Sequence, residues 1–192
     1  MKKLGFYFDM NMCIGCRVCQ IACKDVKDLK MGTLFRQVRT FETGVYPAPG
    51  LYHYSGACNH CTEAKCVKGC PTGALDYAED GTVQHDKDQC IGCKYCTWNC
   101  PYGVPQFIEE KGIISKCDSC KDLRDAGGNP ACVDSCVMRC IEFGDLDELA
   151  AKYGVSVVQD LPILPSSSIT SPSLLITPKK CALDPNYKER GV

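Results

Sequence analysis

The chain has 192 residues, a formal net charge of −1 and 18 cysteines. Because a near-neutral chain lacks the basic surface that a phosphate backbone attracts, we expect no nucleic-acid partner. Only 8% of the residues are aromatic, so the apolar core is expected to be thin, and so many cysteines in a small chain indicate either a disulfide scaffold or metal sites. No apolar run approaches the roughly 18 residues that a membrane span needs, and Asp9 interrupts the only apolar segment near the N-terminus, so we expect neither a span nor a cleavable signal.

Short strands are predicted on either side of the cysteines. Gly5–Asp9 leads into the first cysteines as a strand, and Ile141–Gly144 leaves the last ones as a second strand that is expected to pair with it. Residues Leu75–Glu79 and Thr82–His85 flank an Asp80-Gly81 turn. Apolar and polar residues on both sides of an Asp-Gly turn predict a β-hairpin.

The last third of the chain favours two helices and then an extended tail. Leu123–Ala126 predicts a short helix, and Asp147–Tyr153 a helix that ends at Gly154. From Leu161 onward, five prolines exclude a helix of useful length. Because such a segment cannot build its own core, we expect its apolar residues to lie on a partner. Those residues are Ile163, Leu164, Leu174, Leu175 and Ile176.

Sixteen cysteines fall into four groups, of which the first and third share the spacing C-x2-C-x2-C-x3-C. In bacterial two-cluster ferredoxins this run wraps three thiolates around one four-iron cluster, while the fourth ligates the neighbouring cluster. The second and fourth groups have longer gaps but the same number of thiols. The groups are Cys13, Cys16, Cys19 and Cys23; Cys58, Cys61, Cys66 and Cys70; Cys90, Cys93, Cys96 and Cys100; and Cys117, Cys120, Cys132 and Cys136.

This spacing predicts four [4Fe–4S] clusters arranged as an electron path. Cys19 and Cys23 are four residues apart, a rise of about 6 Å in a helix, so they bring two clusters close together. Gly15 and Gly92 let the ligand loops bend where a side chain would obstruct them. Lysines and arginines beside the groups either offset about −8 of cluster charge or are ordinary solvated charges. They are Arg17, Lys24, Lys65, Lys68, Lys94, Lys116, Lys121 and Arg139.

Three other uses of these cysteines fit less well. Thiols on successive helical turns seldom have the geometry for orderly disulfides. A zinc ribbon uses paired C-x2-C knuckles, whereas the run here offers one ligand too many for a tetrahedral site. A radical SAM enzyme needs C-x3-C-x2-C, a spacing that the chain lacks.

Several residues near the groups have two readings each. Cys140, one helical turn beyond Cys136, is either a substitute ligand or, more commonly, a small buried hydrophobe. Cys181 stands alone in the tail and is structural or incidental. His60 is a donor beside a cluster or a surface residue. Two aromatic residues either shield a cluster from water or pack in the core. These are Tyr95 and Trp98.

Residues 4–155 resemble the four-cluster ferredoxin-type electron-transfer subunit of the dimethyl sulfoxide reductase family of molybdopterin enzymes. The likeness rests on Cys13–Lys24, Cys58–Cys61, Cys66–Ala74, Cys90–Pro105, Lys116–Cys120, Cys132–Cys136 and Phe143–Leu149. It implies an α+β fold of two bacterial-ferredoxin-like modules related by pseudo-twofold symmetry, one inserted in the other, with an extended C-terminal tail. The implied boundaries are 1–50 and 101–155 for the first module, 51–100 for the inserted one, and 156–192 for a partner-binding tail.

The resemblance also implies four ligand sets. Some relatives have tryptophan at the position of Cys93 and hold a three-iron cluster there, so four irons are expected here. The valine after Cys136 departs from a common proline and affects the expected local turn. The sets are Cys13, Cys16, Cys19 and Cys136; Cys23, Cys117, Cys120 and Cys132; Cys58, Cys61, Cys66 and Cys100; and Cys70, Cys90, Cys93 and Cys96.

By the same resemblance, the chain is a non-catalytic subunit that relays electrons between a quinol/quinone or other donor module and a large molybdopterin catalytic subunit. Many members of the family also have a quinone-reactive membrane anchor. The catalytic partner usually carries the export signal for both chains, which predicts the outer face of the cytoplasmic membrane; the alternative is a cytoplasmic complex. Two other classes compete. A free soluble ferredoxin gains little from the long tail, and an enzyme with chemistry at a cluster needs an incomplete ligand set, whereas all four are complete.

Overall fold

The computed structural model describes residues 3–191. Met1 and Lys2, at the start of the segment considered as an export signal, lie outside the described residues, as does Val192. The strands are β1 (Leu4–Asp9), β2 (Gln37–Thr43), β3 (Gly50–Gly56), β4 (Leu75–Tyr77), β5 (Val83–His85), β6 (Gln106–Ile108), β7 (Ile113–Ser115), β8 (Ile141–Asp145), β9 (Leu174–Thr177) and β10 (Tyr187–Arg190). The helices are α1 (Val18–Val26), α2 (Lys65–Lys68), α3 (Tyr95–Asn99), α4 (Lys121–Asp125), α5 (Ala131–Asp134) and α6 (Leu146–Tyr153).

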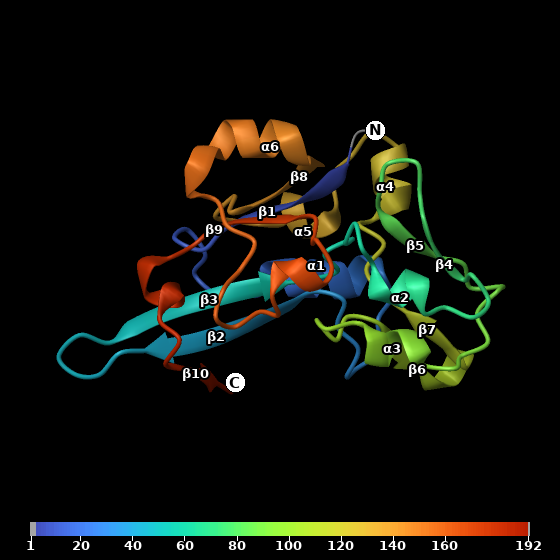
Figure 1. Cartoon of the computed structure of the whole chain (residues 1–192), viewed down its shortest axis with the longest axis horizontal. Coiled ribbons are helices and arrows are strands. Elements are labelled where there is room, and N and C mark those ends of the chain that lie inside the picture. Colours follow the sequence, from blue (N-terminus) through green and yellow to red (C-terminus); the bar gives the residue numbers. More distant parts are fainter. Residues whose placement is uncertain (1–2, 192) are drawn as a thin grey trace.

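A three-stranded sheet of order β8-β1-β9 lies under α6 (Figure 1). β1 pairs antiparallel with β8, with Phe6 opposite Phe143, which confirms the predicted pairing. The predicted helix before Gly154 is α6, where the Asp145 side chain accepts hydrogen bonds from the first free backbone N–H groups. The short helix predicted at Leu123–Ala126 is α4, which starts two residues earlier.

The tail differs from its expected role as an exposed arm. β9 adds to the free edge of β1 as a parallel strand, with Phe8 opposite Ile176. Leu174 is 5% exposed and Ile176 is fully buried in the same core as Phe8, while Ile163 packs against that core. Prolines lie outside β9, so the intervening Leu-Leu-Ile run is free to make ladder hydrogen bonds and bury its side chains within the chain. The expectation that these residues wait for a partner was wrong.

A second sheet of order β10-β2-β3 contains a long hairpin that projects from the body of the molecule (Figure 1). The sequence patterns did not predict this hairpin. The predicted hairpin around Asp80-Gly81 is confirmed as β4 and β5. β6 and β7 form another short hairpin, and short helices and strands together confirm the α+β class.

The core is divided among several small groups of buried side chains. At the end opposite the long hairpin, Leu75, Val83 and Ile114 pack together with Phe107 beside them. Strands β6 and β7 therefore pack on the inserted module, although they lie beyond its expected boundary at residue 100. The β2–β3 hairpin likewise spans the expected boundary at residue 50. The module boundaries remain predictions.

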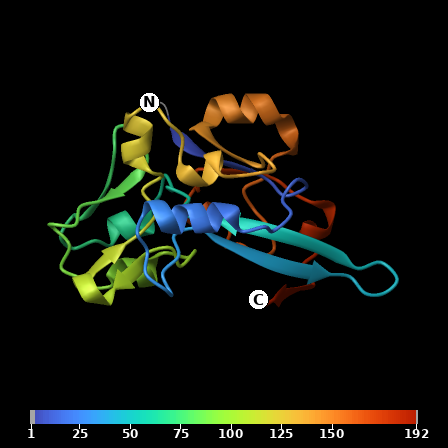
Figure 2. The same cartoon turned by 180° about the vertical axis from the view of Figure 1, so that it is seen from behind.

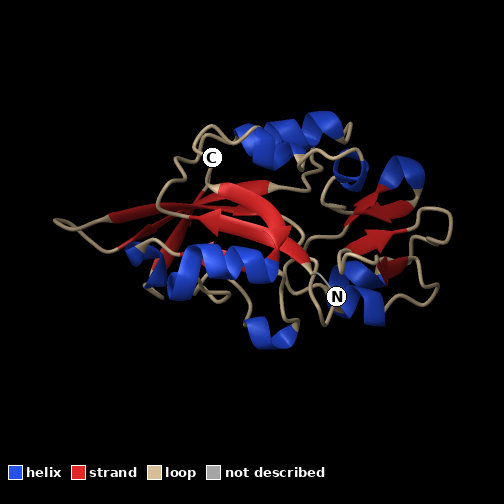
Figure 3. Cartoon of the chain, turned by 90° about the horizontal axis from the view of Figure 1, so that it is seen from above, coloured by secondary structure: helices blue, strands red, loops and turns tan. Residues whose placement is uncertain are grey.

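Helix α1 links the two ends of the molecule. Seen from behind, it runs across the middle and lies next to α5, with which it packs (Figure 2). Seen from above, helices lie on both sides of the larger sheets (Figure 3). Within residues 3–191, no helix has the length and apolar character to cross a membrane.

Candidate metal centres

The first and third cysteine groups adopt the same loop. Gly15 and Gly92 have φ values of 70° and 66°, in the left-handed region that favours glycine. A Cβ atom at Gly15 would lie 2.5 Å from Nδ1 of His53, and one at Gly92 only 2.1 Å from the carbonyl oxygen of Gly112. The next left-handed residues, Arg17 and Lys94, immediately precede α1 and α3. These matched loops fit the expected pseudo-twofold relation.

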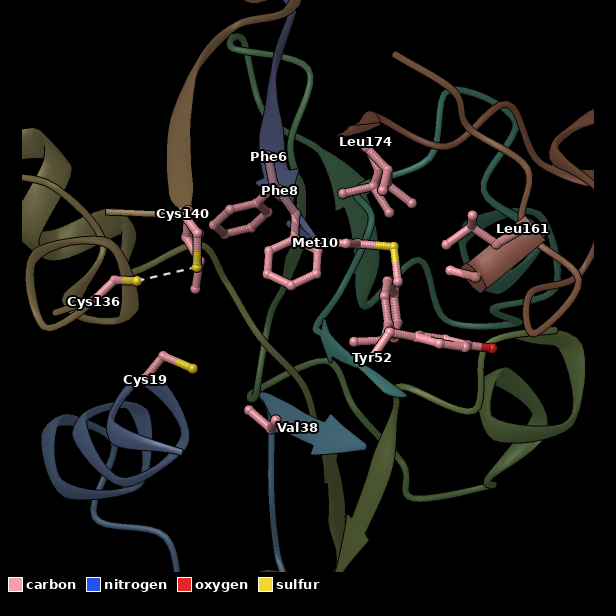
Figure 4. Packing of buried hydrophobic residues seen from close by; sticks show 14 of the residues in the cluster. Phe6, Phe8, Met10, Cys19, Val38, Tyr52, Cys136, Cys140, Leu161 and Leu174 are labelled. Carbon is pink, nitrogen blue, oxygen red and sulfur yellow. Dashed lines mark hydrogen bonds between the residues drawn. The ribbon is translucent and has the colours of Figure 1, made fainter. Parts of the chain in front are cut away.

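The first predicted ligand set converges on one cavity. Cys13, Cys16, Cys19 and Cys136 line about 310 Å³ of empty space together with Cys140. Figure 4 shows the side chains of Cys19, Cys136 and Cys140 grouped beside the buried Phe6 and Phe8. The loop before α1, α1 itself and the segment after α5 thus bring these sulfurs together although more than a hundred residues separate Cys19 from Cys136.

The fourth predicted set lines a matching cavity at the other end. Cys70, Cys90, Cys93 and Cys96 surround about 310 Å³ of empty space, together with apolar side chains that include Leu75. The equal size of the two cavities, each at a motif with the same loop, indicates that both suit the same group.

Mutual electrostatic effects show that the second and third sets also gather. Burial, followed by the nearby Cys132, raises the pKa of Cys23 to about 12, and Cys120 contributes. Cys117 is affected by both Cys23 and Cys132. In the third set, burial and then Cys58, Cys100 and Cys61 raise the pKa of Cys66 to about 12. Thiols close enough to repel one another when ionised form four groups with the predicted membership.

Raised thiol pKa values mean that these sulfurs stay protonated unless a positive charge accompanies them. Iron supplies that charge, and metal binding releases the thiol protons. No group of three or more His, Cys, Asp or Glu residues in the described part of the chain is arranged around a single metal ion. A four-iron cubane instead takes one thiolate at each of four separate irons. The donor chemistry and the sulfur-lined cavities therefore fit [4Fe–4S] clusters.

The four sets form a continuous row. Cys19 and Cys23 on α1 join the first set to the second. Cys58 packs with Cys23 and Cys117 around Phe35, which joins the second set to the third. The third and fourth sets meet across α2 and α3, which pack together. Of the eighteen cysteines, all within the described residues, only Cys16 and Cys93 are exposed, one in the first set and one in the fourth.

The residues with two readings are now placed. His60 is fully buried, and its Nδ1 accepts a hydrogen bond of 3.1 Å from the Val83 N–H. Burial, with Lys116 and then Arg124 nearby, lowers its pKa well below the usual range, so the ring is neutral. The surface reading of His60 was therefore wrong.

The other placements are mixed. Trp98 is 76% exposed and Tyr95 is 50% exposed, so the core-packing reading was wrong for both. Cys140 is buried and Cys181 packs against the main core. Sequence reasoning missed Arg36, which is 3% exposed beside the sulfurs, because it belongs to no cysteine motif.

Comparison with known proteins agrees with this geometry. Residues 50–146 match the model of the 4Fe-4S dicluster domain. The chain is 41% identical to the iron–sulfur subunit of the anaerobic dimethyl sulfoxide reductase of Haemophilus influenzae, over 95% of this chain and 92% of that protein. It is 42% identical to the corresponding subunit of the Escherichia coli enzyme, over 92% of this chain and 89% of that protein. It is 33% identical to a subunit of the sulfite dehydrogenase of Allochromatium vinosum, over 82% of this chain and 75% of that protein.

The match, the identities and the sulfur-lined sites lead to one conclusion. The protein transfers electrons, and its cofactors are four [4Fe–4S] clusters. The chain belongs to the 4Fe-4S dicluster domain family, among the proteins that resemble the iron–sulfur subunit of anaerobic dimethyl sulfoxide reductase.

Proposed function

We propose that the chain is a non-catalytic relay subunit that passes electrons between a quinol/quinone or other donor module and a large molybdopterin catalytic subunit. The observation that carries this proposal is the row of four sulfur sets whose exposed members, Cys16 and Cys93, belong to its first and last sets. A row with buried middle sites and one opening at each end suits passage from one partner to another. An enzyme with chemistry at a cluster would need an incomplete set.

The clusters are assigned in that order along the row. The matched cavities and the mutual effects among the thiols support this assignment. Cys13, Cys16, Cys19 and Cys136 hold the first cluster; Cys23, Cys117, Cys120 and Cys132 the second; Cys58, Cys61, Cys66 and Cys100 the third; and Cys70, Cys90, Cys93 and Cys96 the fourth.

The two openings carry apolar side chains at equivalent positions. Ile14, next to the first opening, is 57% exposed, and Ile91, next to the last, is 67% exposed. Trp98 on α3 adds a large exposed ring near the last set. Aromatic and aliphatic residues gathered at an opening favour protein interfaces. We therefore infer one docking face at each end.

The partners and location follow from the relatives. Those relatives are parts of a dimethyl sulfoxide reductase and of a sulfite dehydrogenase, which supports a large catalytic partner for this chain. We propose a molybdopterin subunit on one face and a quinone-reactive membrane anchor on the other. Co-export with the catalytic subunit would place the complex at the outer face of the cytoplasmic membrane, and a cytoplasmic complex is the alternative.

Anaerobic purification of the tagged chain from its native cells tests the proposal. We expect a large subunit with bound molybdopterin to co-purify, about sixteen irons per relay subunit, and only four-iron EPR signals. Recovery of the chain alone, with all its clusters and without partners from gently lysed cells, would favour the free ferredoxin instead. Zinc in place of iron would contradict the cluster assignment.

A further inference from the structure

Lys116 carries a buried positive charge at the junction of the second and third sulfur sets. Its side chain belongs to a residue that is 4% exposed. Nζ donates hydrogen bonds to the carbonyl oxygens of Val83 at 2.5 Å and Cys117 at 2.9 Å, and lies 3.8 Å from Sγ of Cys58. The ammonium group thus touches the backbone of one set and a sulfur of the next.

Arg36 carries a second buried charge, between the first and second sets. Its Nη1 donates to the carbonyl oxygen of Ser55 at 3.0 Å and to the hydroxyl at 3.1 Å, and that hydroxyl lies 3.4 Å from Sγ of Cys19. Nε and Nη2 have no hydrogen-bond partner. The guanidinium also lies 4.7 Å from the centre of the Phe6 ring. Burial opposes its charge, but the thiolates of Cys132, Cys19 and others outweigh burial and raise its pKa.

These two cations differ from other partly buried ones in what neutralises them. Lys27 pairs with Asp118, and Arg124 pairs with Asp80, each at 2.7 Å. Within residues 3–191, no carboxylate lies within ion-pair distance of Lys116 or Arg36. An isolated buried charge costs several kcal/mol or more, so such groups are paired in native proteins. The anionic groups that surround these two cations are the sulfur sets.

We propose that Arg36 and Lys116 are the fixed countercharges of the electron path, Arg36 between the first and second clusters and Lys116 between the second and third. This inference rests on the proposed ligand sets. Each transfer oxidises one cluster and reduces the next by one electron, and no covalent bond forms or breaks. An oxidised all-cysteine cluster already carries about −2, so the added electron is unfavourable unless a nearby positive charge stabilises the reduced form. The two cations hold up the reduction potentials of their neighbouring clusters.

The test measures reduction potentials by EPR-monitored titration of the intact complex. Lys116→Gln keeps a donor for the carbonyl groups but removes the charge, and Lys116→Arg keeps the charge. We expect Lys116→Gln to lower the reduction equilibrium constant of the third cluster at least about tenfold, which is ~59 mV for one electron. Lys116→Arg should remain close to the unchanged chain. Arg36→Gln and Arg36→Lys form the equivalent pair, with the shift in the first or second cluster.

Lys152→Gln is the matched control, because it makes the same chemical change at an exposed lysine paired with Glu142. It should leave all four potentials unchanged. Unaltered potentials in Lys116→Gln and Arg36→Gln, with four clusters present, would overturn the proposal while the wild-type iron content leaves the relay function standing. If Lys116→Gln loses a cluster, retention of that cluster in Lys116→Arg supports a charge effect, whereas its loss in both variants shows a purely structural role and overturns the proposal.

Discussion

Cys140 brings a fifth sulfur to the cavity of the first ligand set. Its Sγ lies 3.4 Å from Sγ of Cys136 (Figure 4). Cys140 also keeps its proton and donates it toward Cys13, which lowers the pKa of Cys13 to about 7. A protonated thiol beside complete ligands is a hydrogen-bond donor to them rather than a ligand.

We therefore predict that Cys140→Ala keeps the first cluster. The four remaining thiols of that cavity are complete, so the variant should retain about sixteen irons and four-iron EPR signals. Cys136→Ala is the matched variant, expected to lose an iron from the same cluster. A three-iron signal in Cys140→Ala, with a normal spectrum in Cys136→Ala, would show that Cys140 is the ligand.

Cys93 is exposed at the opening of the fourth cavity, so a larger side chain can be accommodated there. Cys93→Trp removes one ligand and should convert only the fourth cluster to a three-iron form of higher potential. EPR of the oxidised protein would show the new signal, and iron analysis would show the loss of about one iron. Loss of all four clusters would instead mean that this site is needed for folding.

The sulfur ligands could be found from sequence because most of them are neighbours in the chain, and ligand spacing is a local property. Arg36 could not. It reaches the sulfurs through Ser55 on β3, a contact between strands that no local pattern encodes. Lys116 lies beside Cys117, but its burial depends on β5, where its acceptor Val83 lies.

Among the elements, those with a local signal were predicted and those made by long-range pairing were not. The Asp80-Gly81 turn indicates its own hairpin because the Asp80 side chain accepts a hydrogen bond from the Thr82 N–H. β9 has no such signal. It becomes a strand because β1 offers a free edge more than 160 residues away, and the flanking prolines favoured an extended arm instead.

Ile176 tests the corrected role of the tail. It is fully buried, so Ile176→Ala should destabilise the protein by about 2–5 kcal/mol through lost burial and a residual cavity. Leu183 is 50% exposed in the same tail, and Leu183→Ala should cost far less. The measurement is chemical unfolding followed by cluster absorbance and circular dichroism. Equal, small effects of both variants would return the tail to the role of a loose arm.

At the scale of the whole molecule, the cysteines are part of the core. Cys19, Cys132 and Cys136 belong to the main buried group, and Cys23, Cys58 and Cys117 surround Phe35 in another. Short helices such as α2 and α5 have four residues each and cannot persist alone. Clusters that join sulfurs from distant segments therefore hold together elements that are too short to fold by themselves.

The last prediction follows from that dependence. Removal of iron by a chelator under anaerobic conditions should abolish the near-ultraviolet circular dichroism and disperse the elements, because the clusters' binding free energy is also folding free energy. Reconstitution with iron and sulfide should restore the native signal, whereas the same incubation with reductant but no chelator should leave it intact. The β2–β3 hairpin, whose own core includes Phe41 and Tyr52, is the segment expected to keep most residual structure. An iron-free chain with native circular dichroism and a cooperative unfolding transition would show that side-chain packing alone specifies the fold.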